Sequence, residues 1–424
     1  MSRWLYTLVF HLLLPAILLR LYWRGGKAPA YRERIGERFG ITPPLRSETQ
    51  APLWIHAVSV GEVQAASLLI RHLLQASPEL PLLITTMTPT GAERVRALFG
   101  NQVEHRYCPY DLPWALSSFL KKTQPRACVI IETELWPNML RQCRRQGIPT
   151  LLANARLSER SARGYARIGA LTRSMLRQID SVAVQNATDG ERFMRLGLPA
   201  DRLKVTGSIK FDAAIDAGWL RRARELKQTW GEQRPVLVAG STHEEEEALL
   251  LQVFTRLQQD FPTLLLILVP RHPERFEPVW ELCLASGQTA QRISDSTEIE
   301  AQTKLLLVDR MGELMTYYAT ADIALVGGAF IERGGHNPLE PALLGKPVIM
   351  GRHCFNFAEI CAGLAAAGGL VQVADDDDLT RQLKLWLQMP DQAQLAGQHA
   401  ADYVASNTGA VERVVALLQP LMHR

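Results

Sequence analysis

Ten short apolar runs, each of strand length, follow one another along the chain. They lie at 52–58, 80–86, 127–132, 150–154, 181–185, 235–240, 263–270, 304–309, 323–328 and 346–351. Amphipathic stretches with helical spacing, such as Glu62–Gln75 and Glu244–Gln259, separate them. Apolar runs that alternate with helices are typical of parallel sheets covered on both faces. A polar stretch around 212–234 divides the runs into two sets, so we expect two doubly wound α/β domains that bind ligands at their strand-to-helix turns.

A longer apolar segment, WLYTLVFHLLLPAILLRLYW at residues 4–23, precedes the first run. It has about the length of a helix that crosses a bilayer, with Trp and Tyr at both ends. His11, Pro15 and Arg20 weaken that interpretation, and no small-residue cleavage site follows, so a removable signal peptide is not expected. Basic residues directly after the segment predict that the following domain stays on the cytoplasmic side. A spanning anchor, a helix in the membrane plane and a buried first helix all stay open.

Composition narrows the function classes. The length of 424 residues, with 47% hydrophobic and 21% charged residues, fits two globular domains. The net charge of +4 is low for a nucleic-acid binder, so no nucleic-acid partner is expected. The six cysteines form no C-x-x-C pair and no zinc-like group with histidine, which predicts a reduced environment without structural zinc. The sequence also lacks G-x-G-x-x-G, Walker A, G-x-S-x-G and H-E-x-x-H patterns, which argues against the chemistries that these motifs support.

Polar residues mark the turns after the first set of strands. Residues 56–62 read HAVSVGE, with a glycine and a carboxylate where the next helix begins, and residues 132–138 read ETELWPN. A carboxylate in the first turn stabilises a helix through the helix dipole, so Glu62 has a structural interpretation beside a functional one. Glu132 and Glu134 at a strand end suggest chemistry, hydrolysis included, although the sequence does not set their separation.

The turns of the second set are rich in small residues. Residues 240–243, GSTH, lead into a helix, where backbone N–H groups can bind an anion or a hydroxyl can cap the helix. Arg271 ends an apolar strand and places a guanidinium at its mouth. Four glycines in the nine positions 327–335 suggest a backbone kept open for a ligand. Asn337 at the N-cap and Glu340 at N3 complete a capping box, so Glu340 also has a purely structural interpretation.

Eight motifs, taken in order, resemble the lipid A 3-deoxy-D-manno-octulosonic acid (Kdo) transferases of lipopolysaccharide synthesis. They are SVGE (59–62), ETELWPN (132–138), NARLSERS (154–161), GSIKFD (207–212), GSTHEEEE (240–247), VPRHPERF (269–276), MGELMTYY (311–318) and GGHNPLEPA (334–342). The resemblance implies the GT-B fold, two Rossmann-like domains with an active-site cleft between them. We expect a membrane anchor or interfacial helix at 1–23, an acceptor-binding domain at 24–212 and a CMP-Kdo-binding domain at 213–424, with the last helix able to pack back on the first domain.

The same resemblance implies an inverting glycosyltransferase that moves Kdo from CMP-Kdo to the lipid A precursor, lipid IVA. It implies a place at the cell inner membrane, with the catalytic body on the cytoplasmic side and membrane lipids as partners. Glu62 is then the general base, and Glu132 and Lys210 stabilise the transition state. CMP contacts are implied at Pro270, Arg271, Met311, Gly312, Glu313, Asn337, Pro338, Leu339 and Glu340. The donor carries a single phosphate, so neither a metal nor another cofactor is expected.

A group of arginines is a candidate acceptor surface. On a helix, one face would carry Arg156, Arg160, Arg163 and Arg167. This face is either simply solvated or binds the phosphates of lipid A and anionic headgroups, and Arg34 and Arg38 belong to the same hypothesis.

Two other functions stay open at this point. Another membrane-associated GT-B glycosyltransferase would use a UDP-sugar and respond to UDP, whereas a Kdo transferase responds to CMP. A non-catalytic lipid- or nucleotide-binding adaptor would have no need of Glu62 and Lys210. The sequence does not set the number of Kdo units added or the oligomeric state.

Overall fold

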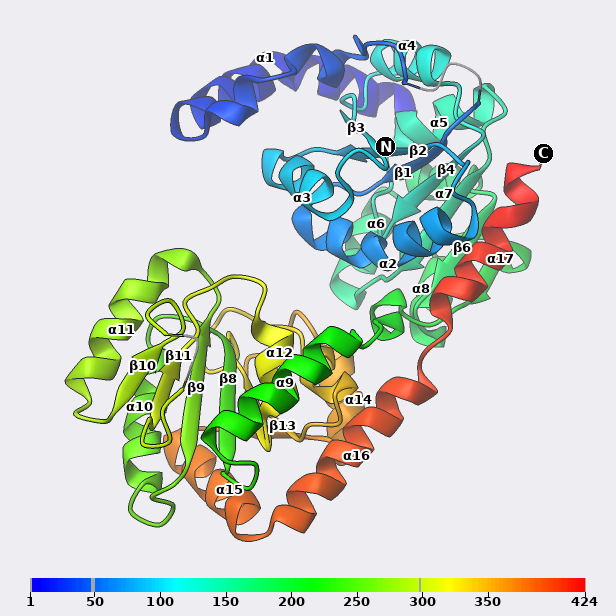
Figure 1. Cartoon of the computed structure of the whole chain (residues 1–424). Helices are drawn as coiled ribbons and strands as arrows, with labels where there is room; N and C mark the ends of the chain where they lie inside the picture. Colours follow the sequence, from blue (N-terminus) through cyan, green and yellow to red (C-terminus); the bar gives the residue numbers. More distant parts are fainter. Residues whose placement is uncertain (1, 47–49, 297–298, 424) are drawn as a thin grey trace. The chain divides into compact units, whose positions relative to one another are not determined.

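The computed structural model describes residues 2–46, 50–296 and 299–423, and the chain divides into two units (Figure 1). The first unit comprises Met1–Asp212 and Thr408–Arg424, and the second comprises Ala213–Asn407. Each unit has its own parallel sheet and its own buried core. The prediction of two doubly wound α/β domains is therefore confirmed.

The first unit holds, in its described residues, a seven-stranded parallel sheet in the order β3-β2-β1-β4-β5-β6-β7. The strands are β1 (Leu53–His56), β2 (Leu82–Thr86), β3 (Glu104–Tyr107), β4 (Ala127–Ile131), β5 (Thr150–Ala155), β6 (Ser181–Val184) and β7 (Leu203–Val205). The chain runs outward from β1 to β3 and starts again at β4 on the other side of β1, where Leu53 lies opposite Ala127. The β1–β4 pair is thus the topological switch point, beside which ligands bind in such sheets.

Helices cover both faces of this sheet. They are α2 (Val60–Ala76), α3 (Pro89–Phe99), α4 (Pro113–Thr123), α5 (Pro137–Arg145), α6 (Glu159–Arg167), α7 (Gly169–Leu176), α8 (Ala187–Arg195) and α17 (Ala410–Met422). Successive side chains of a strand point to opposite faces. Leu53 and Ile55 therefore join the core under α2, α3 and α17, while Trp54 joins the core under α4, α5 and α7.

The end of the chain belongs to the first unit, although it follows the second domain in the sequence. The apolar face of α17, with Val414 and Leu418, is buried in the same core as α2. Asp212, at the end of the 3-10 helix η4 (Ile209–Asp212), accepts the backbone N–H groups of Gly409 at 2.6 Å and Val411 at 2.5 Å. These bonds fix the start of α17 beside the point where the chain leaves the first unit.

The second unit repeats the plan, with a described sheet in the order β10-β11-β9-β8-β12-β13-β14. Its strands are β8 (Val236–Thr242), β9 (Leu265–Pro270), β10 (Ala290–Arg292), β11 (Leu305–Leu307), β12 (Ile323–Val326), β13 (Val348–Gly351) and β14 (Leu370–Val373). Its helices are α9 (Ala217–Trp230), α10 (Glu246–Leu257), α11 (Phe276–Ala285), α12 (Leu314–Thr320), α13 (Leu339–Leu343), α14 (Ala358–Ala366), α15 (Asp376–Gln388) and α16 (Pro390–Ser406). The switch point lies between β8 and β12, and the polar stretch around 212–234 forms α9, which packs on α12.

The predicted N-terminal apolar helix is also confirmed. Helix α1 (Arg3–Lys27) contains Pro15, and by length and composition it is apolar enough to cross a membrane. Most of its side chains are exposed, so it is not a buried core helix. Two short 3-10 turns, η1 (Pro29–Arg32) and η2 (Ile35–Phe39), lead from it back to the body of the unit.

Candidate active site

Glu62 lies in the first turn of α2, directly after β1 and beside the switch point of the first unit. Its side chain is nearly buried; Oε2 accepts the backbone N–H of Val58 at 2.6 Å and Oε1 accepts the hydroxyl of Ser59 at 3.0 Å. Burial, together with the negative charges of Glu134 and Glu132, raises the pKa of Glu62 to about 7. A carboxyl with a pKa near neutrality is well matched to proton transfer. The structural and the chemical interpretations of Glu62 therefore coexist.

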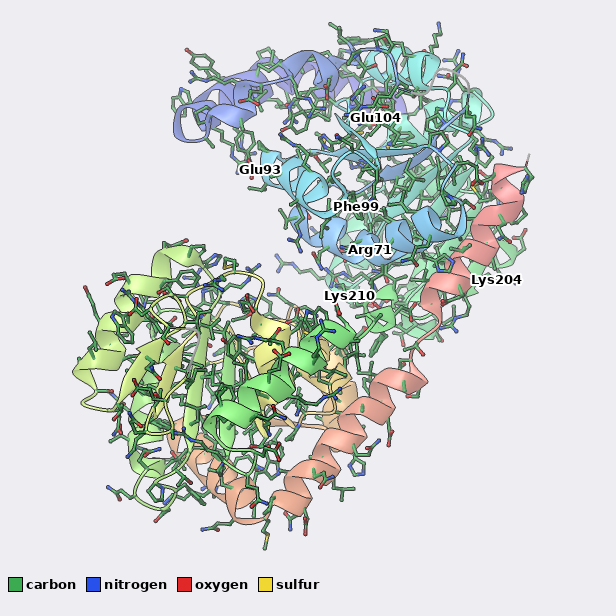
Figure 2. All side chains as sticks on the ribbon, in the orientation of Figure 1. Arg71, Glu93, Phe99, Glu104, Lys204 and Lys210 are labelled. Carbon is green, nitrogen blue, oxygen red and sulfur yellow. The ribbon has the colours of Figure 1, made fainter. Side chains whose placement is uncertain are left out.

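Glu132 follows β4, on the other side of the switch point. Its backbone is left-handed, with φ 60°, which is uncommon for a residue with a side chain and recurs at functional sites. Its carboxylate lies 3.6 Å from Nζ of Lys210 and 3.4 Å from Nε of Arg156. Lys210, labelled in Figure 2, lies in η4, and burial lowers its pKa against the opposing effect of Glu132. One carboxylate held between two cations leaves a net positive charge, which suits an anionic group.

The loop after β4 also connects to the end of β1 through an aromatic contact. The Trp136 indole donates to Oε2 of Glu134 at 2.9 Å, and the Trp136 ring packs edge-on against His56 with centroids 5.0 Å apart. Burial lowers the pKa of His56 to about 4, so the imidazole is neutral at pH 7. Nδ1 of this ring lies 2.9 Å from the hydroxyl of Thr85 on the neighbouring strand. The buried His56 thus fixes the ring that orients Glu134.

In the second unit, Glu246 joins the turns that follow β8 and β12. Its carboxylate is 1% exposed and accepts the backbone N–H groups of Gly328 at 2.8 Å, His243 at 3.0 Å and Phe330 at 3.1 Å. The expected anion cradle at 240–243 is therefore occupied in part by the protein's own carboxylate. The alternative, a helix cap from Ser241 or Thr242, is not present: residue 245 precedes α10 without a side-chain cap.

The nine residues implied to contact CMP lie at one edge of the second sheet. Pro270 ends β9 and Arg271 follows it, residues 311–313 follow β11, and residues 337–340 follow β12. Carboxyl ends of parallel strands share an edge, so these turns are neighbours. Gly312 has φ 90°, a conformation that favours glycine.

Arg271 and Glu340 are oppositely charged residues of this edge. Burial raises the pKa of Glu340, while a hydrogen bond with Asn337 and the positive charge of Arg271 lower it. Asn337 Oδ1 accepts the backbone N–H of Leu339 at 3.2 Å, at the first residue of α13. The helix begins one residue later than the predicted capping box, with Pro338 in the N-cap position.

Sequence reasoning missed a pair of stacked histidines at this edge. The rings of His243 and His336 lie 5.0 Å apart at 14°, and Nε2 of one donates to Nε2 of the other over 2.7 Å. Burial lowers the pKa of both rings to about 4, and nearby arginines, Arg333 and Arg271 among them, act in the same direction. The sequence did contain a sign of this pair, because one histidine belongs to the GSTH motif and the other to the GGHN motif.

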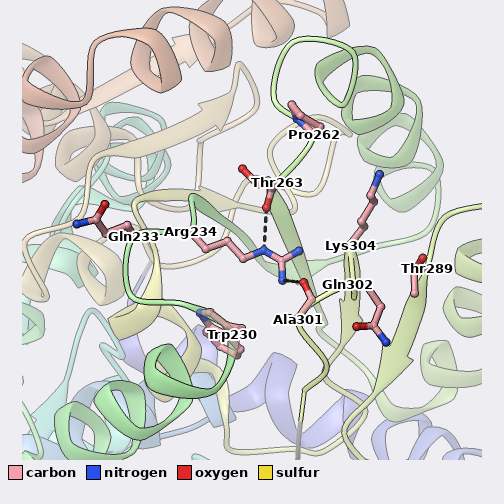
Figure 3. A pocket seen from close by; sticks show the side chains of 9 residues that line it. All are labelled: Trp230, Gln233, Arg234, Pro262, Thr263, Thr289, Ala301, Gln302 and Lys304. Atoms are coloured by element: carbon pink, nitrogen blue, oxygen red, sulfur yellow. Dashed lines mark hydrogen bonds between the residues drawn. The ribbon is translucent and has the colours of Figure 1, made fainter.

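A hollow of about 490 Å³ lies at the opposite end of the second unit's sheet (Figure 3). The Arg234 guanidinium donates to the carbonyls of Thr263 at 2.7 Å and Ala301 at 2.9 Å beside it. This arginine therefore ties together the loops that precede the strands. The predicted CMP contacts lie at the other edge, so the hollow is separate from them.

The predicted arginine surface holds only in part. Ser158 caps α6 by accepting the backbone N–H of Ser161, so the helix begins at Glu159 and Arg156 lies outside it. Arg160, Arg163 and Arg167 are exposed on α6.

Of the remaining pair, Arg34 and Arg38, Arg38 does not fit the hypothesis. Arg38 is 1% exposed and donates to the carbonyl of Met87 at 3.0 Å, so its guanidinium is not available to a phosphate. Arg34 is held by Glu37 through two hydrogen bonds of 2.8 Å.

Across residues 2–46, 50–296 and 299–423, no three His, Cys, Asp or Glu side chains form a group able to hold a metal ion. The absence of a metal requirement stays a prediction.

Comparison with known proteins identifies the family. Residues 33–213 match the family model for 3-deoxy-D-manno-octulosonic-acid transferase (kdotransferase), and residues 229–402 match glycosyl transferases group 1. The chain is 40% identical to the 3-deoxy-D-manno-octulosonic acid transferase of Haemophilus influenzae, with 100% of each chain covered, and 36% identical to that of Bordetella pertussis, with 99% of each covered. A solved structure, UDP-GlcNAc 2-epimerase from Neisseria meningitidis, shares the fold, with a TM-score of 0.59 at 15% identity over 87% of this chain and 99% of that chain. The chain therefore belongs to the 3-deoxy-D-manno-octulosonic acid transferase family and is a glycosyltransferase with the GT-B fold.

Proposed function

We propose that the chain transfers Kdo from CMP-Kdo to the lipid A precursor lipid IVA, with inversion at the anomeric carbon. The observation that carries this proposal is Glu62, a nearly buried carboxyl whose pKa is raised to about 7 at the switch point of the first unit. An adaptor that only binds has no use for a carboxyl tuned to proton transfer.

In the proposed step, the ionised Glu62 carboxylate takes the proton of the acceptor hydroxyl. The hydroxyl oxygen forms a bond to the anomeric carbon of Kdo from the face opposite to the leaving group, which gives inversion. The bond between that carbon and the phosphate oxygen breaks, and CMP leaves with the bonding electron pair. One base is enough, because the departing phosphate needs charge stabilisation more than it needs a proton.

Glu132 and Lys210 are proposed to stabilise this transition state. The Lys210 ammonium balances the negative charge that grows on the departing phosphate, and Arg156 adds a second cation beside it. The Glu132 carboxylate holds both cations and balances positive charge on the sugar ring.

CMP is proposed to bind at the edge formed by the turns after β9, β11 and β12. Arg271 suits the phosphate as a charged donor, and Glu340 suits the ribose hydroxyls as an acceptor. Met311–Glu313 and Asn337–Leu339 complete the contacts, and no step in the proposal uses a metal ion.

Membrane attachment at the cytoplasmic face of the inner membrane is proposed to come from α1. The exposed arginines of α6, Arg160, Arg163 and Arg167, are proposed to bind the phosphates of the lipid acceptor. Exchanging Arg163 and Arg167 for Glu is then expected to weaken acceptor binding and leave CMP binding intact. Unchanged binding of both ligands would contradict this assignment.

Mass spectrometry of the product tests the reaction. CMP-Kdo and lipid IVA are incubated with the membrane-reconstituted wild type, with Glu62→Gln and with the matched control Glu93→Gln, an exposed glutamate of α3 labelled in Figure 2. We expect a product heavier by one or more Kdo units from the wild type and the control, and a rate reduced about 10²- to 10⁴-fold in Glu62→Gln. No product from folded wild type would refute the proposal, and inhibition by UDP but not by CMP would favour a UDP-sugar donor. Equal rates in all three would remove Glu62 as the base.

A further inference from the structure

Helix α1 docks on the first unit along a single narrow stripe. The docked side chains recur at spacings of three and four residues, as one face of a helix does; they are Arg3, Tyr6, Thr7, Phe10, Leu14 and Ile17. The Arg3 guanidinium and the Thr7 hydroxyl each donate to Oδ1 of Asn138 at 3.1 Å. Phe10, Leu14 and Ile17 follow one another along the apolar cluster around Tyr110, Leu112 and Ala115.

Apart from the buried Leu21 and Gly25, the other side chains described for residues 3–26 of α1 are exposed, and most of them are apolar. Its most exposed large side chains are Trp4 (75%), Trp23 (75%), Leu12 (72%), Tyr22 (62%), Leu19 (58%) and Leu8 (57%). The outward face of a helix on a water-soluble body is normally polar. A continuous apolar face of this kind therefore needs an apolar environment outside the protein.

The apolar face extends onto the body of the unit. Phe39 stacks on Trp114 with centroids 6.0 Å apart and lies 5.7 Å from Tyr110, the residue that also contacts Phe10 of α1. Trp114 is half exposed and Ile41 is 67% exposed. Figure 1 shows α1 beside α4, the helix that carries Trp114. Helix and body thus present one apolar surface.

Basic residues accompany this surface. The exposed ones on and next to α1 and α4 are Arg20, Arg24, Arg32, Lys121 and Lys122. Arg32 lies over the Tyr22 ring at 4.0 Å and donates to the Tyr22 carbonyl at 3.0 Å, which folds η1 back on the end of α1. Apolar side chains with basic residues beside them complement a lipid leaflet with anionic headgroups.

From these contacts we propose that α1 lies in the plane of the membrane, immersed in one leaflet, and does not cross the bilayer. From Arg3 to Ile17 the docked stripe covers about 21 Å of helix, whereas the hydrocarbon core of a bilayer is about 30 Å thick. If α1 crossed the bilayer while docked, the side of the unit on which it packs, including Asn138, would therefore lie in the hydrocarbon core. The inference rests on the proposed membrane attachment and adds its geometry.

The docked stripe also joins the membrane to the candidate active site. Asn138, the acceptor of both α1 hydrogen bonds, lies in the first turn of α5, which follows the loop 132–136. Asp111 fixes this turn by accepting the backbone N–H groups of Asn138 at 3.0 Å and Met139 at 2.8 Å. An immersed α1 thus sets the height of Glu132 and Glu134 above the leaflet, where the sugar of a lipid-anchored acceptor lies.

Labelling from each side of the membrane tests the orientation. Cysteines are introduced singly at Ser2, which precedes α1, at Gly26 in the last turn of α1, and at Glu93 on the body; the six native cysteines are buried. A membrane-impermeant maleimide is added to sealed vesicles of each orientation. We expect all three positions to react from the same side. Reaction of Ser2→Cys only from the side opposite to Glu93→Cys would overturn the proposal, because it would show a crossing helix.

Immersion is measured with nitroxide labels at Leu5, Leu12 and Leu19, all exposed on α1. In vesicles that contain anionic lipid, an in-plane helix gives all three labels a similar, shallow depth by oxygen and nickel-chelate accessibility. A crossing helix makes Leu12 the deepest, by about 10 Å, because seven residues separate it along the helix from Leu5 and from Leu19. Labels that stay in water would overturn the lipid assignment. No substrate is present, so a chain without Kdo transfer activity would fail the proposed function and leave this test unaffected.

Discussion

Two glutamates at equivalent places in the two units show how burial and hydrogen bonding separate their roles. Glu62 and Glu246 each stand in the first turn of the helix that follows the first strand of a sheet. Glu246 gives its carboxylate to three backbone N–H groups in two turns. Glu62 accepts only one backbone N–H and one hydroxyl, and burial, with two carboxylates nearby, raises its pKa to about 7. We therefore treat Glu62 as the base and Glu246 as a positioning residue.

The pH dependence of transfer follows from Glu62. The base must be ionised, so kcat/KM is expected to rise with pH, with an apparent pKa of about 7, and to level off above it. The raised pKa of Glu62 also makes the free energy of unfolding depend on pH, but this contribution falls as the pH rises. Because the fold raises the pKa above its ordinary value of 4.5, the contribution of Glu62 to stability is present below about pH 4.5 and is lost as the pH rises through about 7.

Initial rates between pH 5.5 and 8.5, with Glu93→Gln as a control that should keep the wild-type profile, provide the measurement. A wild-type profile that is flat across this range would show that ionisation of Glu62 does not limit the reaction.

Glu246→Gln is expected to disturb donor binding. The amide replaces one accepting oxygen with an N–H donor, so at least one buried backbone N–H loses its partner, at a cost of about 1–3 kcal/mol. The turn at 327–330 then loosens, and the next residues along the chain include Asn337 and Glu340. We expect KM for CMP-Kdo to rise several-fold while kcat falls less. Exposed Glu245→Gln on the same helix start serves as the control, and an unchanged KM in Glu246→Gln would argue against a positioning role.

Arg156 shows where sequence reasoning about single residues fails. Its spacing from Arg160 and Arg163 predicts a shared helical face, yet it lies before the helix and pairs with Glu132. A local feature of the sequence could have corrected this prediction. Ser158 is a good N-cap residue, and its hydroxyl accepts the backbone N–H of Ser161, so the helix begins after Arg156. The contacts of Glu132 with Lys210 and Arg156 join segments far apart in the sequence, so spacing could not reveal them.

At the scale of elements, all ten predicted strands are present, and the four that were missed have a common cause. The missed strands are β3, β7, β10 and β14, which are the edges of the two sheets. An edge strand is covered less completely than a central one, so it does not need to be apolar throughout. β10 has no buried residue and β7 is mostly exposed, which removes the apolar run used to recognise the other strands.

Helix α17 gives an element-scale prediction. Leu418 is fully buried in the first unit's core, although it lies beyond the second domain in the sequence. Leu418→Ala should leave a cavity and lower the free energy of unfolding of the first unit by about 2–5 kcal/mol. The exposed neighbour Gln419→Ala should change it by less than about 0.5 kcal/mol. Urea unfolding of both variants measures this, and equal midpoints would show that α17 contributes little to that core.

At the scale of the whole molecule, each unit has a core of its own, built by its own sheet and helices. Two cores of this size favour two separate unfolding transitions over one. The proposed donor contacts all lie in Ala213–Asn407, whereas the proposed base lies in the first unit. Ligand binding can therefore report which unit holds the nucleotide.

Calorimetry with and without CMP turns this division into a prediction. A ligand that binds only the folded second unit stabilises it by about 2.7 kcal/mol at a hundred times its dissociation constant and leaves the first unit unaffected. We expect CMP to raise the transition that Glu246→Gln lowers, and to leave unchanged the transition that Leu418→Ala lowers. The two variants thus assign the transitions to units without reference to activity. If CMP raised only the transition that Leu418→Ala lowers, the nucleotide would bind the first unit and the proposed donor site would be wrong. If UDP, and not CMP, raised the transition that Glu246→Gln lowers, the donor would be a UDP-sugar bound at the proposed location.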